Sequence, residues 1–94
     1  MKMYKAIDNL VKSDDVEAIC IGEMLSSQVE KFVFLLQERG FTRLEGEEGV
    51  VEFCCWVRRR ANKSCQIFTS YNEEDILDRL VHCCKRHAAF EVAA

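Results

Sequence analysis

Six cysteines and two histidines are the residues best suited to metal binding or nucleophilic chemistry. Four of them suit a tetrahedral Cys3His zinc site, two on neighbouring predicted strands and two one helical turn apart: Cys54, Cys65, Cys83 and His87. However, none forms the C-x2-C turn that usually presents two thiolates, and the cysteines lie in apolar runs. The sequence therefore favours reduced, mostly buried thiols that pack as small hydrophobic residues, without a metal or cofactor. A zinc site is the alternative.

Nucleophilic catalysis receives little support from the same residues. Cys83 and His87 are spaced to touch on a helix, but near a helix C-terminus the dipole opposes a thiolate. Phosphate-binding glycine motifs are absent, and the carboxylates of Glu45, Glu47 and Glu48 lack the spacing of a calcium loop. The sequence predicts a protein that is not an enzyme and has no catalytic residues.

The basic cluster of the chain is Arg58-Arg59-Arg60 followed by Lys63, close to the single tryptophan, Trp56. These cations suit three roles: a solvated turn that protects a sheet edge, a contact with a protein partner, or a contact with nucleic acid. Four cations would release few counterions from nucleic acid, so the affinity gained that way would be small. A protein partner is favoured over nucleic acid.

Length and charge limit the class of protein further. The chain has 94 residues, 49% of them hydrophobic, and a net charge of −3. This composition predicts one globular domain, residues 1–94, without the basic surplus of a dedicated nucleic-acid-binding domain. No apolar stretch reaches the roughly 20 residues of a membrane span, and no apolar segment follows the first lysines as in a secretory signal. We therefore expect a cytoplasmic protein, either monomeric or homodimeric.

The sequence predicts three helices before residue 41. Met3, Ile7, Leu10 and Val11 have helical spacing within residues 3–12. Residues 16–22 suit helix or strand, and a capping-box pattern at Asp14 favours helix. A second capping box at Ser27 begins a helix that ends at Arg39-Gly40.

Three strands are expected next: Phe41–Glu45, Val50–Arg58 and Cys65–Thr69. The glycines of Gly46-Glu47-Glu48-Gly49 suit a hairpin turn, and residues 60–63 suit a second one. A last helix begins at Ser70 or Asn72 and carries an apolar stripe, with Lys85, Arg86 and His87 at its end. Phe90 and Val92 are placed to fold back on the core.

The order α-α-α-β-β-β-α predicts an α+β two-layer sandwich, with a three-stranded antiparallel sheet and the main helices on one face. The last five elements share their order, α-β-β-β-α, with the double-stranded-RNA-binding domain. That resemblance fails at the residues, because acidic Asn72-Glu73-Glu74-Asp75 stands where that family presents lysines to phosphates.

The predicted middle strand supplies the candidate site. Alternation places Val51, Phe53, Cys55 and Val57 on the packed face. A mixed face, either open or covered by the first helix, then carries a partner-binding patch: Glu52, Trp56 and Arg58, extended by Arg59 and Arg60. The expected function is a small non-enzymatic interaction domain acting as a regulator, adaptor or inhibitor, such as a phage or mobile-element inhibitor of a host system. A zinc-stabilised nucleic-acid-binding module is the alternative.

Overall fold

Four α-helices make up the regular structure of the computed structural model, which describes residues 2–68 and 72–93, with side chains to residue 86. They are α1 (Lys2–Val11), α2 (Val16–Glu38), α3 (Arg43–Asn62) and α4 (Glu73–Ala93). No strand occurs in these described segments, so the predicted α+β sandwich is wrong and the fold is an all-α four-helix bundle. None of the described helices is long and apolar enough to cross a membrane.

Helices α1 and α2 follow the sequence signals closely. The predicted helices at residues 3–12 and 16–22 are confirmed, but the cap of α2 is Asp15 instead of the predicted Asp14. The Asp15 carboxylate accepts a hydrogen bond from the Ala18 amide at 2.9 Å. At the other end, Gly40 adopts φ +98°, a backbone conformation that glycine tolerates best. The predicted end at Arg39-Gly40 is therefore confirmed.

The predicted helix start at Ser27 is wrong, because α2 continues through it. The Ser27 hydroxyl donates to the Met24 carbonyl, one turn back in the same helix, instead of accepting from an amide ahead. The helix nevertheless leaves regular geometry at the next residue, Gln28, with φ −135° and ψ 23°. The capping signal thus coincides with a kink inside one helix rather than with a boundary between two.

Helix α3 replaces the first two predicted strands and their hairpin. Its N-cap is a complete capping box, in which the Thr42 hydroxyl accepts from the Glu45 amide while the Glu45 carboxylate accepts from the Thr42 amide. Its buried side chains recur at helical rather than alternating spacing: Val50, Phe53, Cys54 and Val57. Val51 is half-buried and Cys55 exposed, so the predicted packed face is wrong.

Close helix packing explains the two glycines that resembled a hairpin turn. Gly46 and Gly49 lie inside α3 and are buried. A side chain at Gly49 would occupy the position of the Cys84 Sγ atom, so the missing Cβ lets α4 approach α3 there. The Cys84 thiol donates to the Glu45 carbonyl of α3 at 3.5 Å, which fixes the same contact.

The third predicted strand, Cys65–Thr69, is also wrong over its described part. Residues 65–68 form an irregular connection, and Thr69 lies outside the described residues, as do Ser70 and the side chains of His87, Phe90 and Val92. The start of α4 is confirmed at Asn72, whose side chain accepts from the Asp75 amide at 2.8 Å.

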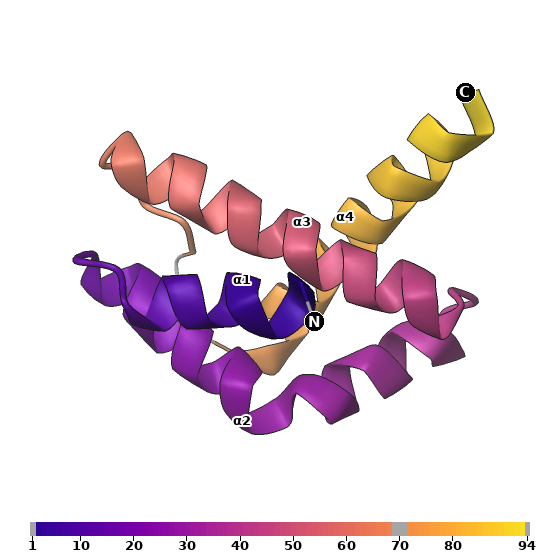
Figure 1. Ribbon diagram of the computed structural model, residues 1–94, viewed down its shortest axis with the longest axis horizontal. Coiled ribbons are helices and arrows are strands. Elements are labelled where there is room, and N and C mark those ends of the chain that lie inside the picture. Colours follow the sequence, from indigo (N-terminus) through magenta and orange to yellow (C-terminus); the bar gives the residue numbers. More distant parts are fainter. Residues whose placement is uncertain (1, 69–71, 94) are drawn as a thin grey trace.

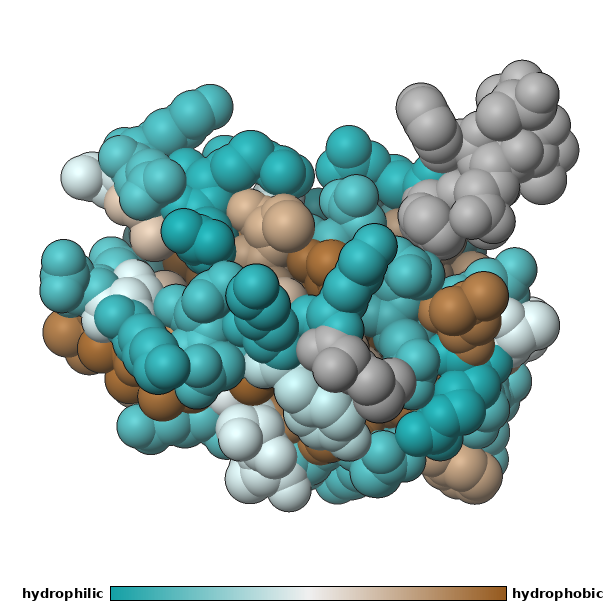
Figure 2. Space-filling model, in the orientation of Figure 1, coloured by the Kyte–Doolittle hydropathy of each residue, from teal (hydrophilic) through white to brown (hydrophobic). Residues whose placement is uncertain are grey.

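All four helices contribute to one hydrophobic core. It contains Met3, Ile7 and Leu10 from α1, which confirms the amphipathic pattern of the first helix. The predicted stripe of α4 is confirmed at Ile76, Leu77, Leu80 and Cys84. On the face seen in Figure 2 the surface is mostly hydrophilic, with one strip of hydrophobic residues along the lower left edge and smaller spots elsewhere.

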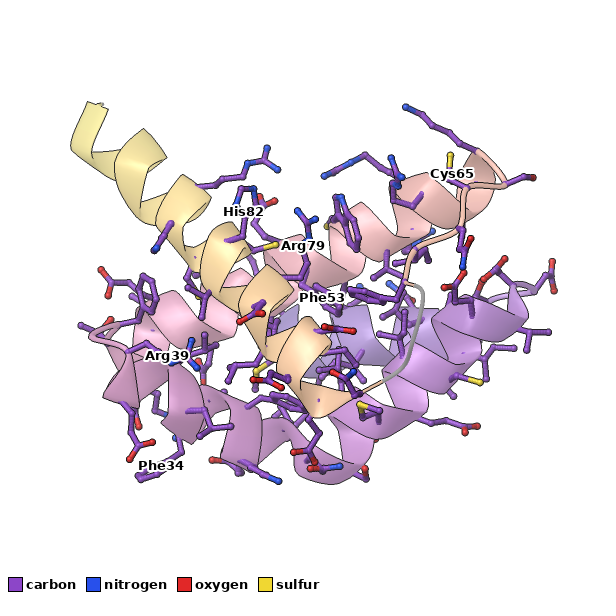
Figure 3. All side chains as sticks on the ribbon, turned by 180° about the vertical axis from the view of Figure 1, so that it is seen from behind. Phe34, Arg39, Phe53, Cys65, Arg79 and His82 are labelled. Carbon is purple, nitrogen blue, oxygen red and sulfur yellow. The ribbon has the colours of Figure 1, made fainter. Side chains whose placement is uncertain are left out.

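The arrangement of α3 and α4 positions the candidate site. Figure 1 shows α4 passing behind α3, and Figure 3 shows the same crossing from the other side. Beyond the crossing the C-terminal halves of both helices diverge, so the two helices form a V in which their C-terminal ends stand on opposite arms.

Candidate binding surface on α3 and α4

One face of α3 gathers four of the five residues that the sequence singled out. Glu52, Trp56, Arg59 and Arg60 are spaced i, i+4, i+7 and i+8, which places them on one side of a helix. The fifth, Arg58, is exposed elsewhere and lines a hollow with Asn9, Lys12, Ser13 and Asp14 at the α1–α2 connection. The predicted patch is therefore divided, and Arg58 does not belong to it.

Trp56 is half-buried at the centre of an aromatic and cationic cluster. Its ring lies 6.0 Å from that of Phe53 and 5.8 Å from that of Phe68, measured between centroids. The guanidinium carbon of Arg79 lies 4.5 Å from the Trp56 centroid and that of Arg60 lies 5.9 Å away. Cation–π attraction at these distances contributes about 0.5–2 kcal/mol, depending on desolvation. Two cations from different helices thus converge on one indole ring.

Glu17 of α2 holds the connection that brings Phe68 to Trp56. Its carboxylate accepts hydrogen bonds from the backbone amides of Ile67, at 3.2 and 3.3 Å, and of Phe68, at 3.0 Å. These amides belong to no helix or strand, so no neighbouring backbone carbonyl of the described segments accepts their hydrogen bonds. The Glu17 carboxylate is the acceptor instead. Phe68 then packs against both Phe53 and Trp56.

An open hollow of about 580 Å³ lies beside this cluster. Ile67 and Phe68 form its apolar part, and the polar part comes from α4: Asp75, Asp78, Arg79 and His82. Arg79 therefore belongs both to the hollow and to the Trp56 cluster. In Figure 3, Arg79 and His82 stand on α4 on the side that faces the arm formed by the end of α3.

The charges that influence the pKa of Cys83 show which other cations lie near this part of α3 and α4. Burial raises the pKa of this thiol to about 11, against the opposing influence of three arginines; Glu52 also raises it. The arginines are Arg79 and Arg86 of α4 and Arg59 of α3. We call the following five residues of these two helices the arginine surface: Trp56, Arg59, Arg60, Arg79 and Arg86.

The arginines of this surface have no ionic partner among the described side chains. The ion pairs there join Lys12 to Asp8, Lys31 to Glu73, and Arg43 to Glu30 and Glu47. These pairs belong to other parts of the bundle. The guanidinium groups of Arg59, Arg60, Arg79 and Arg86 therefore keep their carboxylate-binding geometry available to a ligand.

Sequence reasoning missed the α4 half of the surface. Lys85, Arg86 and His87 were assigned to a helix end, but α4 continues to Ala93, and the dipole effect falls off within the last turn. The signal was present in the spacing: Asp75, Arg79, His82 and Arg86 recur at helical intervals on one face.

The cysteines are only partly as predicted. None is in a disulfide, but burial holds for Cys54, Cys83 and Cys84, whereas Cys20 and Cys55 are exposed and Cys65 is partly exposed. No group of three or more potential ligands that could hold a metal occurs among the described side chains, which do not include His87. The raised pKa of Cys83 is the opposite of what a nucleophilic thiolate needs.

Comparison of the chain with protein-family models, curated proteins and solved structures finds no match.

Proposed function

We propose that this chain is a non-enzymatic protein-binding module that acts as a regulator, adaptor or inhibitor, and that it binds its partner through the arginine surface. The observation that carries the proposal is the position of Trp56 between Arg60 and Arg79 on two different helices. Tryptophan and arginine are the residue types that most often dominate the energy of protein interfaces. The Trp56 ring is held in place by Phe53 and Phe68, so this side chain loses little conformational entropy on binding.

A protein partner fits this surface better than nucleic acid does. Trp56 already contacts Phe53, Phe68 and Arg79, so its ring is engaged and is poorly placed to stack on a base. Asp75 and Asp78 line the adjoining hollow, and Glu52 lies on the same face of α3. These carboxylates would repel a continuous phosphate backbone, whereas a protein surface of mixed charge can match both signs.

The test is capture from cells that encode the chain, with a variant that removes the two cations from Trp56. Arg60→Gln/Arg79→Gln removes both charges but keeps the β- and γ-methylene groups, and it should leave the core untouched because neither residue is buried. Arg39→Gln is the matched control, since Arg39 is also exposed but lies at the end of α2 (Figure 3). A partner retained by the wild type and by Arg39→Gln, and lost by the double variant, supports the proposal.

The captured partner must then be purified and its affinity measured. The double variant should weaken binding by about 2 kcal/mol or more, the range typical of hot-spot residues. Equal affinity for the wild type and the double variant would contradict the proposal, as would enzymatic turnover of the captured molecule by the chain.

A further inference from the structure

The connection between α3 and α4 forms the apolar wall of the open hollow and also covers part of Trp56. Ile67 and Phe68 line the hollow. The ring of Phe68 lies 6.2 Å from that of Phe53 and 5.8 Å from that of Trp56, measured between centroids. The position of the connection therefore sets both the shape of the hollow and the surroundings of the indole ring.

The connection has few contacts of its own that could fix this position. Residues 65–68 form no helix or strand. The Cys65 amide donates to the Arg60 carbonyl at 3.1 Å, and the Gln66 side chain donates to the Phe68 carbonyl at 3.2 Å. Each of these bonds joins residues close in the sequence, so neither holds Phe68 against a different helix.

Glu17 makes such a contact from α2, 50 residues earlier in the chain than Ile67. Its carboxylate accepts from the Ile67 amide and, at 3.0 Å, from the Phe68 amide, and these bonds are partly buried. A carboxylate in the first turn is favoured in any helix, but the helix dipole does not require it to bind amides of a distant segment. Hydrogen bonds to an ionised acceptor are the stronger kind. One carboxylate outside the arginine surface thus holds the backbone of two residues beside it.

We propose that Glu17 is a positioning residue for partner binding at the arginine surface, an inference that rests on the proposed function. Glu17 does not contact the partner and acts through Phe68, whose amide it binds and whose ring packs on Trp56. Trp56 is thereby presented to the partner between Arg60 and Arg79. The binding surface on α3 and α4 is preorganised by a third helix.

Measurements on the free chain test the contacts between Glu17 and Trp56. Glu17→Ala should speed hydrogen–deuterium exchange of the Ile67 and Phe68 amides and increase acrylamide quenching of Trp56. Glu17→Gln should have a smaller effect, because an amide oxygen still accepts a hydrogen bond but carries no charge. Unchanged exchange and quenching in Glu17→Ala would overturn the proposal.

The affinity for the captured and purified partner tests the effect on binding. Glu17→Ala should weaken binding about tenfold, or about 1.4 kcal/mol, because Trp56 and Phe68 must then be ordered as the partner binds. Ile7→Val is the matched control, since it removes one methyl group from the core in α1 and lowers stability by a similar amount. This control should bind the partner as the wild type does. An equal loss of affinity in the control would assign the effect to stability alone and overturn the proposal.

A double variant shows whether Glu17 acts through Phe68. Phe68→Ala removes the ring that links Glu17 to Trp56, so Glu17→Ala should weaken binding little further in the Phe68→Ala background. Additive losses of affinity would mean that Glu17 acts by another route. Weaker binding of Glu17→Ala with unchanged quenching of Trp56 would mean that Glu17 contacts the partner itself. Either result would overturn the proposal.

Failure of this proposal is separable from failure of the proposed function. If Arg60→Gln/Arg79→Gln loses the partner but Glu17→Ala binds it as the wild type does, the arginine surface is the binding site and Glu17 does not position it. If neither variant changes the affinity, both proposals fail.

Discussion

The guanidinium group of Arg79, on α4, lies over the ring of Trp56, on α3, with 4.5 Å between its central carbon and the ring centroid. This contact joins the two helices at the surface, while Gly49 and Cys84 join them in the core. The interface between α3 and α4 is therefore both a packing contact and the floor of the proposed binding surface.

Removing the Arg79 side chain should expose Trp56 to solvent. Because Trp56 is the single tryptophan, its fluorescence reports on this contact without a label. Arg79→Ala should shift the emission to longer wavelength and increase quenching by acrylamide, and Arg39→Ala should do neither. Identical emission and quenching in the wild type and Arg79→Ala would show that Arg79 does not cover the ring.

Gly49→Ala should destabilise the bundle by about 1–3 kcal/mol, the usual effect of overpacking a core. The added Cβ would meet the Cys84 Sγ atom. Gly46→Ala is the matched control, because its Cβ would lie 3.5 Å or more from Leu36 and Val33. This control should be neutral or stabilising by up to about 1 kcal/mol, since alanine favours helix over glycine. Urea denaturation measures both.

Cys84→Ala tests the same contact in reverse. Removing the sulfur makes room for the new methyl group, so Gly49→Ala should cost less in a Cys84→Ala background than in the wild type. Additive effects of the two substitutions on the free energy of unfolding would show that the two residues are not in contact.

Glu17→Ala should loosen the connection between α3 and α4. The Glu17 carboxylate accepts from the Ile67 and Phe68 amides, and hydrogen bonds to a charged group contribute about 1.5–3 kcal/mol, less where solvent reaches them. We expect a loss near 1 kcal/mol together with a change in Trp56 fluorescence, because Phe68 packs on that ring. Glu23→Ala, at an exposed position of α2, should change neither quantity.

The six thiols should react with iodoacetamide in two groups. Burial raises the pKa of Cys54 and Cys84 to about 12 and that of Cys83 to about 11, so these three remain protonated and shielded between pH 7 and 9. Cys20 and Cys55 are exposed and Cys65 is partly exposed, so these three should be alkylated first. Mass spectrometry of the peptides identifies each site, and equal rates at all six would contradict the buried core contacts.

Helix ends and apolar stripes could be predicted from the sequence because they depend on local chemistry. The Gly40 cap, the Asn72 cap and the stripe from Ile76 to Cys84 were all found in this way. Residues 50–58 were wrongly predicted to be a strand, because an almost continuous apolar run satisfies alternating and helical spacing equally. Packing against the other helices stabilises the helical conformation of these residues.

The hairpin turn predicted at Gly46 and Gly49 was wrong for a related reason. Gly46 and Gly49 at both ends of a polar tetrapeptide match a turn, but glycine also marks places where two helices approach closely, and only the position of Cys84 distinguishes these cases. Because residues 50–58 were predicted to be a strand, the α4 residues of the candidate site were not predicted. Arg79 and Arg86 come near Trp56 and Arg59 only when α3 is a helix that crosses α4.

Hydrogen–deuterium exchange of the chain, alone and bound to its purified partner, tests the central claim most directly. If the arginine surface is the interface, binding should slow exchange in residues 56–68 and 75–86, while α1 and the end of α2 near Arg39 should exchange as in the free chain. Protection confined to α1 or to the region around Arg39, with residues 56–68 and 75–86 unchanged, would contradict the account.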